Sequence, residues 1–312
     1  MANSILRSSN SPKNVNSDGR FQPLPFIRGL IWKMAIAILI LMAVGSATRV
    51  MNAGLACPDW PLCYGELVPT QQMNLQVFLE WFHRLDAAAI GLMAMLLVGL
   101  CGWFRRDIPR WLPFAAVGIL GTIVFQGILG ALTVTQLLRF DIVTAHLGTA
   151  LLLFLVVLVV GLILTPYQGM GTARRLGWVS GTGAILVYLQ SLLGGLVASR
   201  WALHQCFGNQ QLCTVMNGHI AGVVLPTLAI LMLVVGAWRT PGLHPMLRKI
   251  AYLSGGILVA QIGLGVATFY LHLQVEPLTV AHQTVGALLL GSLVSFTILA
   301  MRDNLAPEIE KA

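Results

Sequence analysis

Eight long apolar segments constrain what this chain can fold into. An α-helix needs about 20 residues to cross the hydrocarbon core of a bilayer. The chain of 312 residues is 57% hydrophobic and only 10% charged, whereas a soluble domain carries roughly a quarter charged residues. We therefore predict an all-α membrane protein with eight transmembrane helices. The predicted spans are roughly 34–52, 77–103, 111–135, 142–165, 177–199, 217–238, 249–271 and 279–301.

The basic residues predict the orientation of these spans. Of the 19 Lys and Arg residues, only Arg49, Arg84, Arg139 and Arg200 fall in one set of alternate connections. Because cytoplasmic connections carry the excess of positive charge, both termini are predicted to be cytoplasmic. The net charge is +8, but the charged residues lie between the apolar segments and form no basic face. We therefore expect lipid around the chain and exclude nucleic acid as a partner.

The two ends of the chain lie outside the predicted spans. Residues 1–30 are rich in Ser and Asn and are predicted to be a disordered cytoplasmic tail, and residues 303–312 a second tail. The first apolar segment is too long for a cleavable signal peptide. A mitochondrial transit peptide has a similar composition and is an alternative that leaves the membrane core unchanged.

Four histidines reveal an internal repeat. His83 and His146 are 63 positions apart, and so are His219 and His282. The chain thus divides into residues 31–168 and 169–302, each with four helices. Two units of four helices enter the membrane in the same direction. We therefore predict tandem four-helix bundles related by a pseudo-twofold axis along the membrane normal.

Each half thus presents two imidazoles at a similar depth, near the outer ends of helices that run in the same direction. Neutral imidazole is a common axial ligand of haem iron, so each histidine pair is a candidate haem site. Arg49, Arg84, Arg139 and Arg200 are the fixed charges that could bind haem propionates at the outer surface. The alternative is that these histidines only form hydrogen bonds between helices. Gln126, Gln190 and Gln261 have the same two interpretations, interhelical hydrogen bonds or cofactor contact.

Four cysteines lie in outer connections. Disulfides persist on the oxidising side of a bacterial membrane, and Cys57 with Cys63, and Cys206 with Cys213, are close enough in sequence to close small loops. We predict two disulfides, with zinc bound at Cys206 and Cys213 as the alternative. Cys101 is predicted only to pack inside the bundle.

A carboxylate distinguishes the two halves. Glu80 precedes His83 by three residues, so both lie on one helical face, whereas Met216 occupies the same place before His219. A carboxylate at a membrane boundary is costly and usually functional. The alternative is an exposed residue that the helix dipole favours at the helix N-terminus. We predict that the first half transforms a substrate and that the second half holds a permanent haem.

These residues resemble the haem A synthase family over almost the whole chain after the tail. The resemblance is carried by a loop signature, by the motif around His83 and by the surroundings of the other histidines. The matching stretches are Gly54–Gly65 (GLACPDWPLCYG), Glu80–Arg84 (EWFHR), Gln126–Val134, His146–Leu147, Met216–His219 and Ala281–Gln283.

The resemblance implies oxidation of the C8 methyl of haem O to a formyl group, which gives haem A for cytochrome oxidase. By the same resemblance, His219 and His282 hold haem b, and His83 and His146 receive haem O. Glu80 is expected to stabilise positive charge at the methyl carbon or to handle protons. The implied location is a bacterial plasma membrane or a thylakoid. The expected partners are a haem O synthase and an electron acceptor.

Two other functions use the same histidines. A b-type electron-transfer cytochrome would hold two bis-histidine haems but would need neither Glu80 nor different halves. A haem transporter or chaperone would hold haem weakly. A disulfide oxidase centred on Cys57 and Cys63 would instead need a reactive C-x-x-C motif, which this loop lacks.

Overall fold

The computed structural model describes residues 22–173, 175–198, 210–271 and 274–305. All regular secondary structure in these ranges is α-helical. Arg200 and Cys206 lie outside these ranges, so the predicted Cys206–Cys213 disulfide stays a prediction. The helices are α1 (Pro23–Val50), α2 (Leu75–Trp103), α3 (Leu112–Thr135), α4 (Phe140–Leu164), α5 (Leu176–Val197), α7 (Gln210–Gly222), α8 (Val224–Trp238), α9 (Pro245–Tyr270) and α10 (Glu276–Asn304).

The predicted number of membrane spans is confirmed, because the described residues contain eight helical segments that are long and apolar enough to cross a bilayer. The helix ends differ from the prediction at both termini. Helix α1 begins at Pro23, because proline fits the first turn of a helix and Ile27 and Leu30 are buried. Residues 23–30 therefore belong to a helix and not to the predicted tail. Asp303, predicted to start the second tail, is also helical and is 0% exposed.

The sixth predicted span is two helices. Helix α7 ends at Gly222, and α8 begins at Val224. Pro226 explains the break, because proline has no N–H to donate and its ring clashes with the carbonyl four residues earlier, at Gly222. Val223 keeps helical dihedral angles, so the two helices form one interrupted span.

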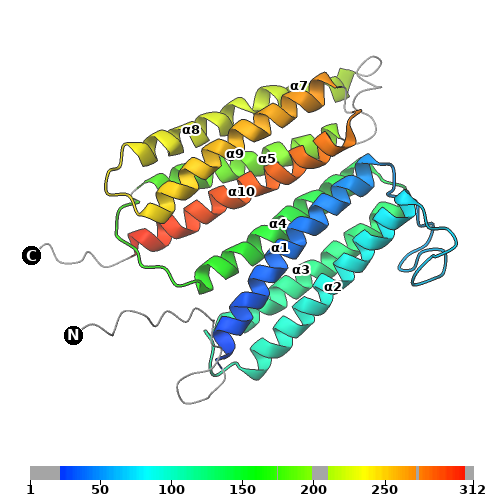
Figure 1. Cartoon of the computed structure of the whole chain (residues 1–312), viewed down its shortest axis with the longest axis horizontal. Helices are drawn as coiled ribbons and strands as arrows, with labels where there is room; N and C mark the ends of the chain where they lie inside the picture. The colour runs from blue at the N-terminus through cyan, green and yellow to red at the C-terminus, as the bar shows by residue number, and fades with distance from the viewer. Residues whose placement is uncertain (1–21, 174, 199–209, 272–273, 306–312) are drawn as a thin grey trace, which may run out of the picture.

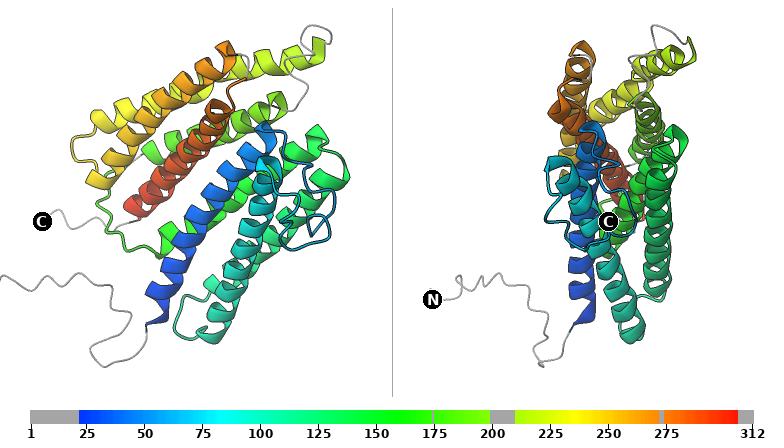
Figure 2. Two further views of the ribbon diagram at one scale, coloured as in Figure 1. Left: turned by 45° about the vertical axis from the view of Figure 1, so that its right-hand side comes forward. Right: turned by 90° about the vertical axis from the view of Figure 1, so that its right-hand side faces the viewer.

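The helices of each half pack mainly against one another (Figures 1 and 2). Helices α1 and α3 each contact α2 and α4, while α5 and α9 each contact α8 and α10. The halves meet through the pairs α1–α10, α4–α5 and α4–α10. A twofold operation that exchanges the halves turns α1–α10 into α5–α4 and leaves α4–α10 in place. The contacts are those that such an axis requires, and the axis itself stays a prediction.

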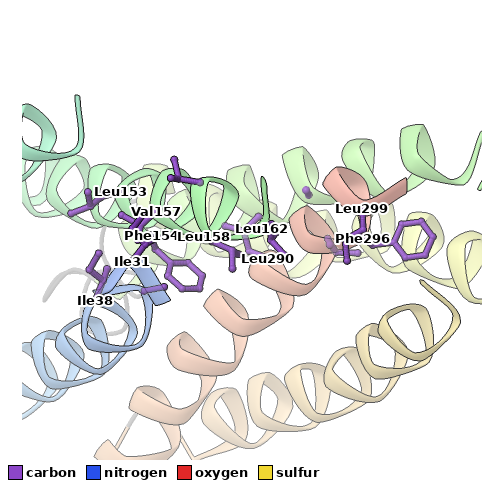
Figure 3. Packing of buried hydrophobic residues seen from close by; sticks show 14 of the residues in the cluster. Ile31, Ile38, Leu153, Phe154, Val157, Leu158, Leu162, Leu290, Phe296 and Leu299 are labelled. Carbon is purple, nitrogen blue, oxygen red and sulfur yellow. The ribbon is translucent and has the colours of Figure 1, made fainter. Parts of the chain in front are cut away.

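The core lies where the halves meet. Figure 3 shows its side chains, which come from α1, α4 and α10 and include Ile31, Val157 and Leu290. Lipid is as apolar as these side chains, so close packing rather than water exclusion holds such helices together. A Cβ at Gly291 would lie 3.0 Å from Cε1 of Phe154. The small residue thus lets α4 and α10 approach closely.

A polar junction fixes the connection between the halves. The predicted boundary at residue 168 falls between the end of α4 and the start of α5. The Asp303 carboxylate accepts hydrogen bonds from the backbone N–H groups of Met170 at 2.8 Å, Thr172 at 2.6 Å and Ala173 at 2.8 Å. The end of α10 therefore anchors the segment that joins the two halves.

Candidate functional site

The histidine pair of the second half has the spacing of two ligands to one metal. The rings of His219 on α7 and His282 on α10 have centroids 6.5 Å apart and planes inclined by 87°. A metal–imidazole bond is about 2 Å long and the ring nitrogen lies about 1.1 Å from the centroid, so two rings on one metal are roughly 6 Å apart. The separation of these two rings is therefore close to that of two imidazoles bound to one metal.

The first half carries its two histidines at the same end of the bundle as the second half. His83 lies on α2 and His146 lies on α4. Helices α2, α4, α7 and α10 all begin at the right-hand end of the bundle in Figure 1, and each carries its histidine in the second or third turn. The four imidazoles thus share one end of the molecule, as predicted from the sequence.

Each imidazole lies against a glycine of the preceding long helix. We call these four residues the socket glycines, because a Cβ at any of them would crowd the ring atom Cε1 of the histidine. The pairs, with the distance from the position of that Cβ to Cε1, are Gly45–His83 at 2.7 Å, Gly130–His146 at 3.4 Å, Gly194–His219 at 2.9 Å and Gly265–His282 at 2.9 Å. The same packing occurs in all four helix pairs.

The ring nitrogens fit axial ligation of haem. The Nδ1 atoms of His83, His146 and His282 are buried and have no hydrogen-bond partner among the described residues. Beside each ring runs the main chain of the residue four positions before its socket glycine, which is Leu41, Gln126, Gln190 or Gln261. For His83 and His146, an Nδ1–H directed at such a carbonyl would leave Nε2 free for a metal.

Haem suits this ligand set better than a bare ion does. In the part of the chain that the structure describes, no three His, Cys, Asp or Glu side chains come together in a way that could hold a metal ion. Haem brings its own ring nitrogens and needs only two axial ligands from the protein. The paired histidines therefore fit haem.

Glu80 lies beneath the disulfide loop and is 4% exposed. Its Oε1 lies 2.6 Å from the guanidinium of Arg84, and its Oε2 accepts a hydrogen bond of 2.8 Å from the backbone N–H of Cys57. Both partners carry N–H groups that favour the charged form of the carboxylate. The contacts suit a fixed negative charge better than a proton carrier.

The loop between α1 and α2 is closed by the predicted Cys57–Cys63 disulfide, which the structure confirms. Arg84 holds this loop by donating to the carbonyls of Asp59 at 2.6 Å and Leu62 at 2.5 Å. The Asp59 carboxylate in turn accepts hydrogen bonds from the N–H groups of Tyr64 and Gly65. The pKa of Asp59 is lowered, and the hydrogen bond from Gly65 is the main cause. Disulfide, loop and α2 thus form one connected unit above His83.

The arginines predicted to bind haem propionates already have partners. Arg49 donates to the carbonyl of Gly195 at 3.1 Å, which links α1 to the other half. Arg84 is engaged with Glu80 and the loop carbonyls, and Arg139 pairs with Asp141 at 2.7 Å. Arg200 lies outside the described residues. Propionate binding by these arginines stays a prediction, and Arg84 would have to release loop contacts to take part.

Sequence reasoning missed two features of this site. The socket glycines Gly45 and Gly194 had no assigned role, although Gly194 follows Gln190 by four residues, as Gly130 follows Gln126. Asp86, three residues after His83, was also overlooked. Its Oδ2 is buried without a hydrogen-bond partner in the described structure, and a lone acid in an apolar segment was the signal that could have identified it.

We predict that Gly265→Ala weakens haem binding in the second half by about tenfold to a hundredfold, the usual effect of disturbing the support of a metal-binding histidine. The added methyl would lie 2.9 Å from Cε1 of His282 and displace the ring. Haem content of the purified protein, from its absorbance, measures the effect. Gly263→Ala is the matched control, because a Cβ there meets open space. Equal haem content in both variants would show that the socket does not position His282.

A family model and several named proteins are similar to most of this chain. The model of the family described as cytochrome oxidase assembly protein, COX15-CtaA, matches residues 28–294. A protein of Shewanella oneidensis named "Heme A synthase" is 28% identical, with 85% of this chain and 95% of that protein covered. One of the same name from Rhodospirillum centenum is also 28% identical, with 89% and 87% covered.

A third relative matches a smaller part of the chain. A protein of Haloarcula marismortui named "Protoheme IX farnesyltransferase" is 36% identical, with 35% of this chain and 22% of that protein covered. Because so little of that protein is matched, its name says nothing about the reaction catalysed here.

Proposed function

This chain belongs to the COX15-CtaA family of cytochrome oxidase assembly proteins, and we propose on that premise that it is a haem A synthase. It is a multi-pass membrane oxidoreductase of haem biosynthesis that oxidises haem O. The reaction converts the C8 methyl group of haem O to a formyl group. The family match over most of the chain is the observation that carries this conclusion.

In this proposal the second half holds a resident haem b. The 6.5 Å separation of the His219 and His282 rings supports this assignment, as do the glycines on which both rings lie. When bound, the haem supplies one-electron redox chemistry. The protein supplies the two imidazoles, their fixed orientation and an apolar surrounding that limits contact with water.

The first half binds haem O through His83 and His146. Glu80 lies beneath the disulfide loop of this half, whereas Met216 occupies the corresponding position in the second half. Glu80 provides a negative charge whose position is set by Arg84 and the Cys57 amide. We infer that this charge stabilises positive charge that develops on the substrate.

The orientation and partners follow from the charge pattern and the family. We infer that both termini are cytoplasmic and that the Cys57–Cys63 loop is on the outer face of a bacterial plasma membrane or a thylakoid. A haem O synthase would supply the substrate, and a membrane or soluble electron acceptor would remove the electrons from the reaction.

Pigment analysis tests the function directly. The protein is expressed together with a haem O synthase, and the haems of the membrane are extracted and separated. A haem A synthase yields haem A that is missing when the protein is omitted. Haem b alone, held tightly by the protein, would indicate an electron-transfer cytochrome. Readily exchanged haem without a formyl product would indicate a transporter or chaperone.

The role of Glu80 gives a separate prediction. Glu80→Gln keeps the size of the side chain but removes its charge, so haem A formation should fall by about a hundredfold, as for the loss of one group that stabilises charge in a transition state. Haem content should stay normal, and mass spectrometry should show an intact Cys57–Cys63 disulfide.

Glu66→Gln is the control for Glu80→Gln, because Glu66 lies exposed in the same loop. Normal haem A yield in Glu80→Gln would refute the catalytic role. Loss of the disulfide or of haem would show that Glu80 only supports the loop.

A further inference from the structure

The four histidines lie in similar sockets, and one socket differs from the other three. The residue four positions before the socket glycine is Gln126 in α3, Gln190 in α5 and Gln261 in α9. In α1 the corresponding residue is Leu41. The exception therefore belongs to His83, in the half proposed to receive the substrate.

The glutamines join the helix that bears the ligand to the helix that bears the socket. Gln126 donates from Nε2 to the carbonyl of His146 at 2.9 Å, and Gln190 donates to the carbonyl of His219. Gln190 Nε2 also lies 3.0 Å from Nδ1 of His219, and Gln261 Nε2 lies 3.5 Å from Nε2 of His282. Gln126 and Gln190 thus hold the main chain of the turn that carries the histidine, while Gln261 contacts the ring of His282.

Two of the glutamine amides pack tightly against a glycine of the helix that bears the histidine. A Cβ at Gly222 would lie 2.6 Å from Oε1 of Gln190, and a Cβ at Gly286 would lie 3.1 Å from Nε2 of Gln261. Glycine on the ligand-bearing helix therefore makes room for the amide. One hydrogen bond between membrane helices changes an equilibrium or a rate by a modest factor, about threefold to tenfold.

Leu41 cannot form such a contact, since its side chain has no polar atom. Between α1 and α2, the Thr48 hydroxyl lies 3.3 Å from the carbonyl of Leu79. This hydroxyl already donates to Val44 at 2.9 Å. His83 is consequently held by packing against Gly45, without the amide contact that the other three histidines have.

We propose that Gln126, Gln190 and Gln261 are positioning residues that hold three ligands in place, and that Leu41 leaves His83 as the ligand that releases. This inference rests on the proposed function, in which haem O enters and haem A leaves the first half at each turnover, whereas haem b stays. A site that exchanges its haem benefits from one loosely held ligand, because product release often limits turnover. A permanent site benefits from two held ligands.

The test is the rate at which each haem leaves the protein. The full chain is loaded with haem O during co-expression with a haem O synthase, purified, and mixed with excess apomyoglobin, which traps released haem. Leu41→Gln should slow the release of first-half haem by about threefold to tenfold, the effect of one interhelical hydrogen bond. Leu41→Met is the matched control of similar size without an amide, and its release should be unchanged.

Two reciprocal variants keep the proposal testable if Leu41→Gln does not fold. Gln190→Leu should speed the release of the second-half haem about threefold to tenfold, and Gln126→Leu should further speed that of the first. Unchanged rates in the variants that fold would overturn the proposal, and so would equal slowing by Leu41→Met and Leu41→Gln.

Extracted pigments of the unchanged protein test the function separately. Absence of haem A with the expected release rates would refute the enzyme assignment alone, and haem A with unchanged rates would refute the positioning roles alone.

Discussion

The His282→Ala variant is expected to lose the tightly bound haem of the second half. His282 and His219 are spaced for one iron, and removal of either ring leaves a single axial ligand. Loss of at least about 3 kcal/mol of binding free energy would weaken haem binding more than about a hundredfold. The absorbance of the purified protein and its haem-to-protein ratio measure the loss.

His244→Ala is a suitable control for this variant. His244 lies before α9, where its Nδ1 accepts a hydrogen bond from Met246 and its ring packs on Tyr167, away from the two pairs. Its removal should leave the haem content unchanged. Full haem content in both His282→Ala and His219→Ala would show that this pair does not ligate haem.

The spans could be predicted from the sequence because membrane crossing depends on length and composition. The ends depend on finer features. Pro23 starts α1 eleven positions before the predicted start at residue 34, because a proline is accepted in a first turn and the residues that follow find partners to pack against. Pro226 divides the sixth span, although the hydropathy there is continuous. Hydropathy alone predicts neither the start of α1 at Pro23 nor the break in the sixth span at Pro226.

The histidines could be predicted from their repeat, but their surroundings could not. The spacing identifies His83, His146, His219 and His282 without any structure. Which residue of the neighbouring helix each ring touches depends on how the two helices are rotated and shifted against each other. Spacing within one helix does not contain that information. With the contacts known, the Gln-to-Gly interval of four residues is recognisable in three helices, and Leu41 stands out as the exception.

Glu80 illustrates the same limit in another way. Its place on the face of His83 follows from a separation of three residues, and its burial was expected for a functional acid. The sequence also places Arg84 four residues after it, a favourable spacing for an ion pair, and the structure shows that pair at 2.6 Å. The contact with the Cys57 amide arises from the fold of the loop, which helical periodicity does not describe.

The His83→Ala variant is expected to abolish haem A formation while the second-half haem remains. His83 and His146 are the residues proposed to bind the substrate, and a substrate held by one ligand is no longer oriented for reaction. A displacement of about 1 Å can lower a rate by about a hundredfold, so product should fall at least that much. Extracted pigments report the product, and the absorbance of the purified protein reports the remaining haem.

The second half provides the internal control for this experiment. If His83→Ala removes all bound haem and His282→Ala does not, the roles assigned to the two halves are reversed. His83→Met separates ligation from packing, because methionine can also ligate haem iron but is flexible and lacks a ring. Partial recovery of haem A in His83→Met relative to His83→Ala would show that iron ligation is what position 83 contributes. Equal activities would instead point to the ring packed on Gly45 as the essential feature.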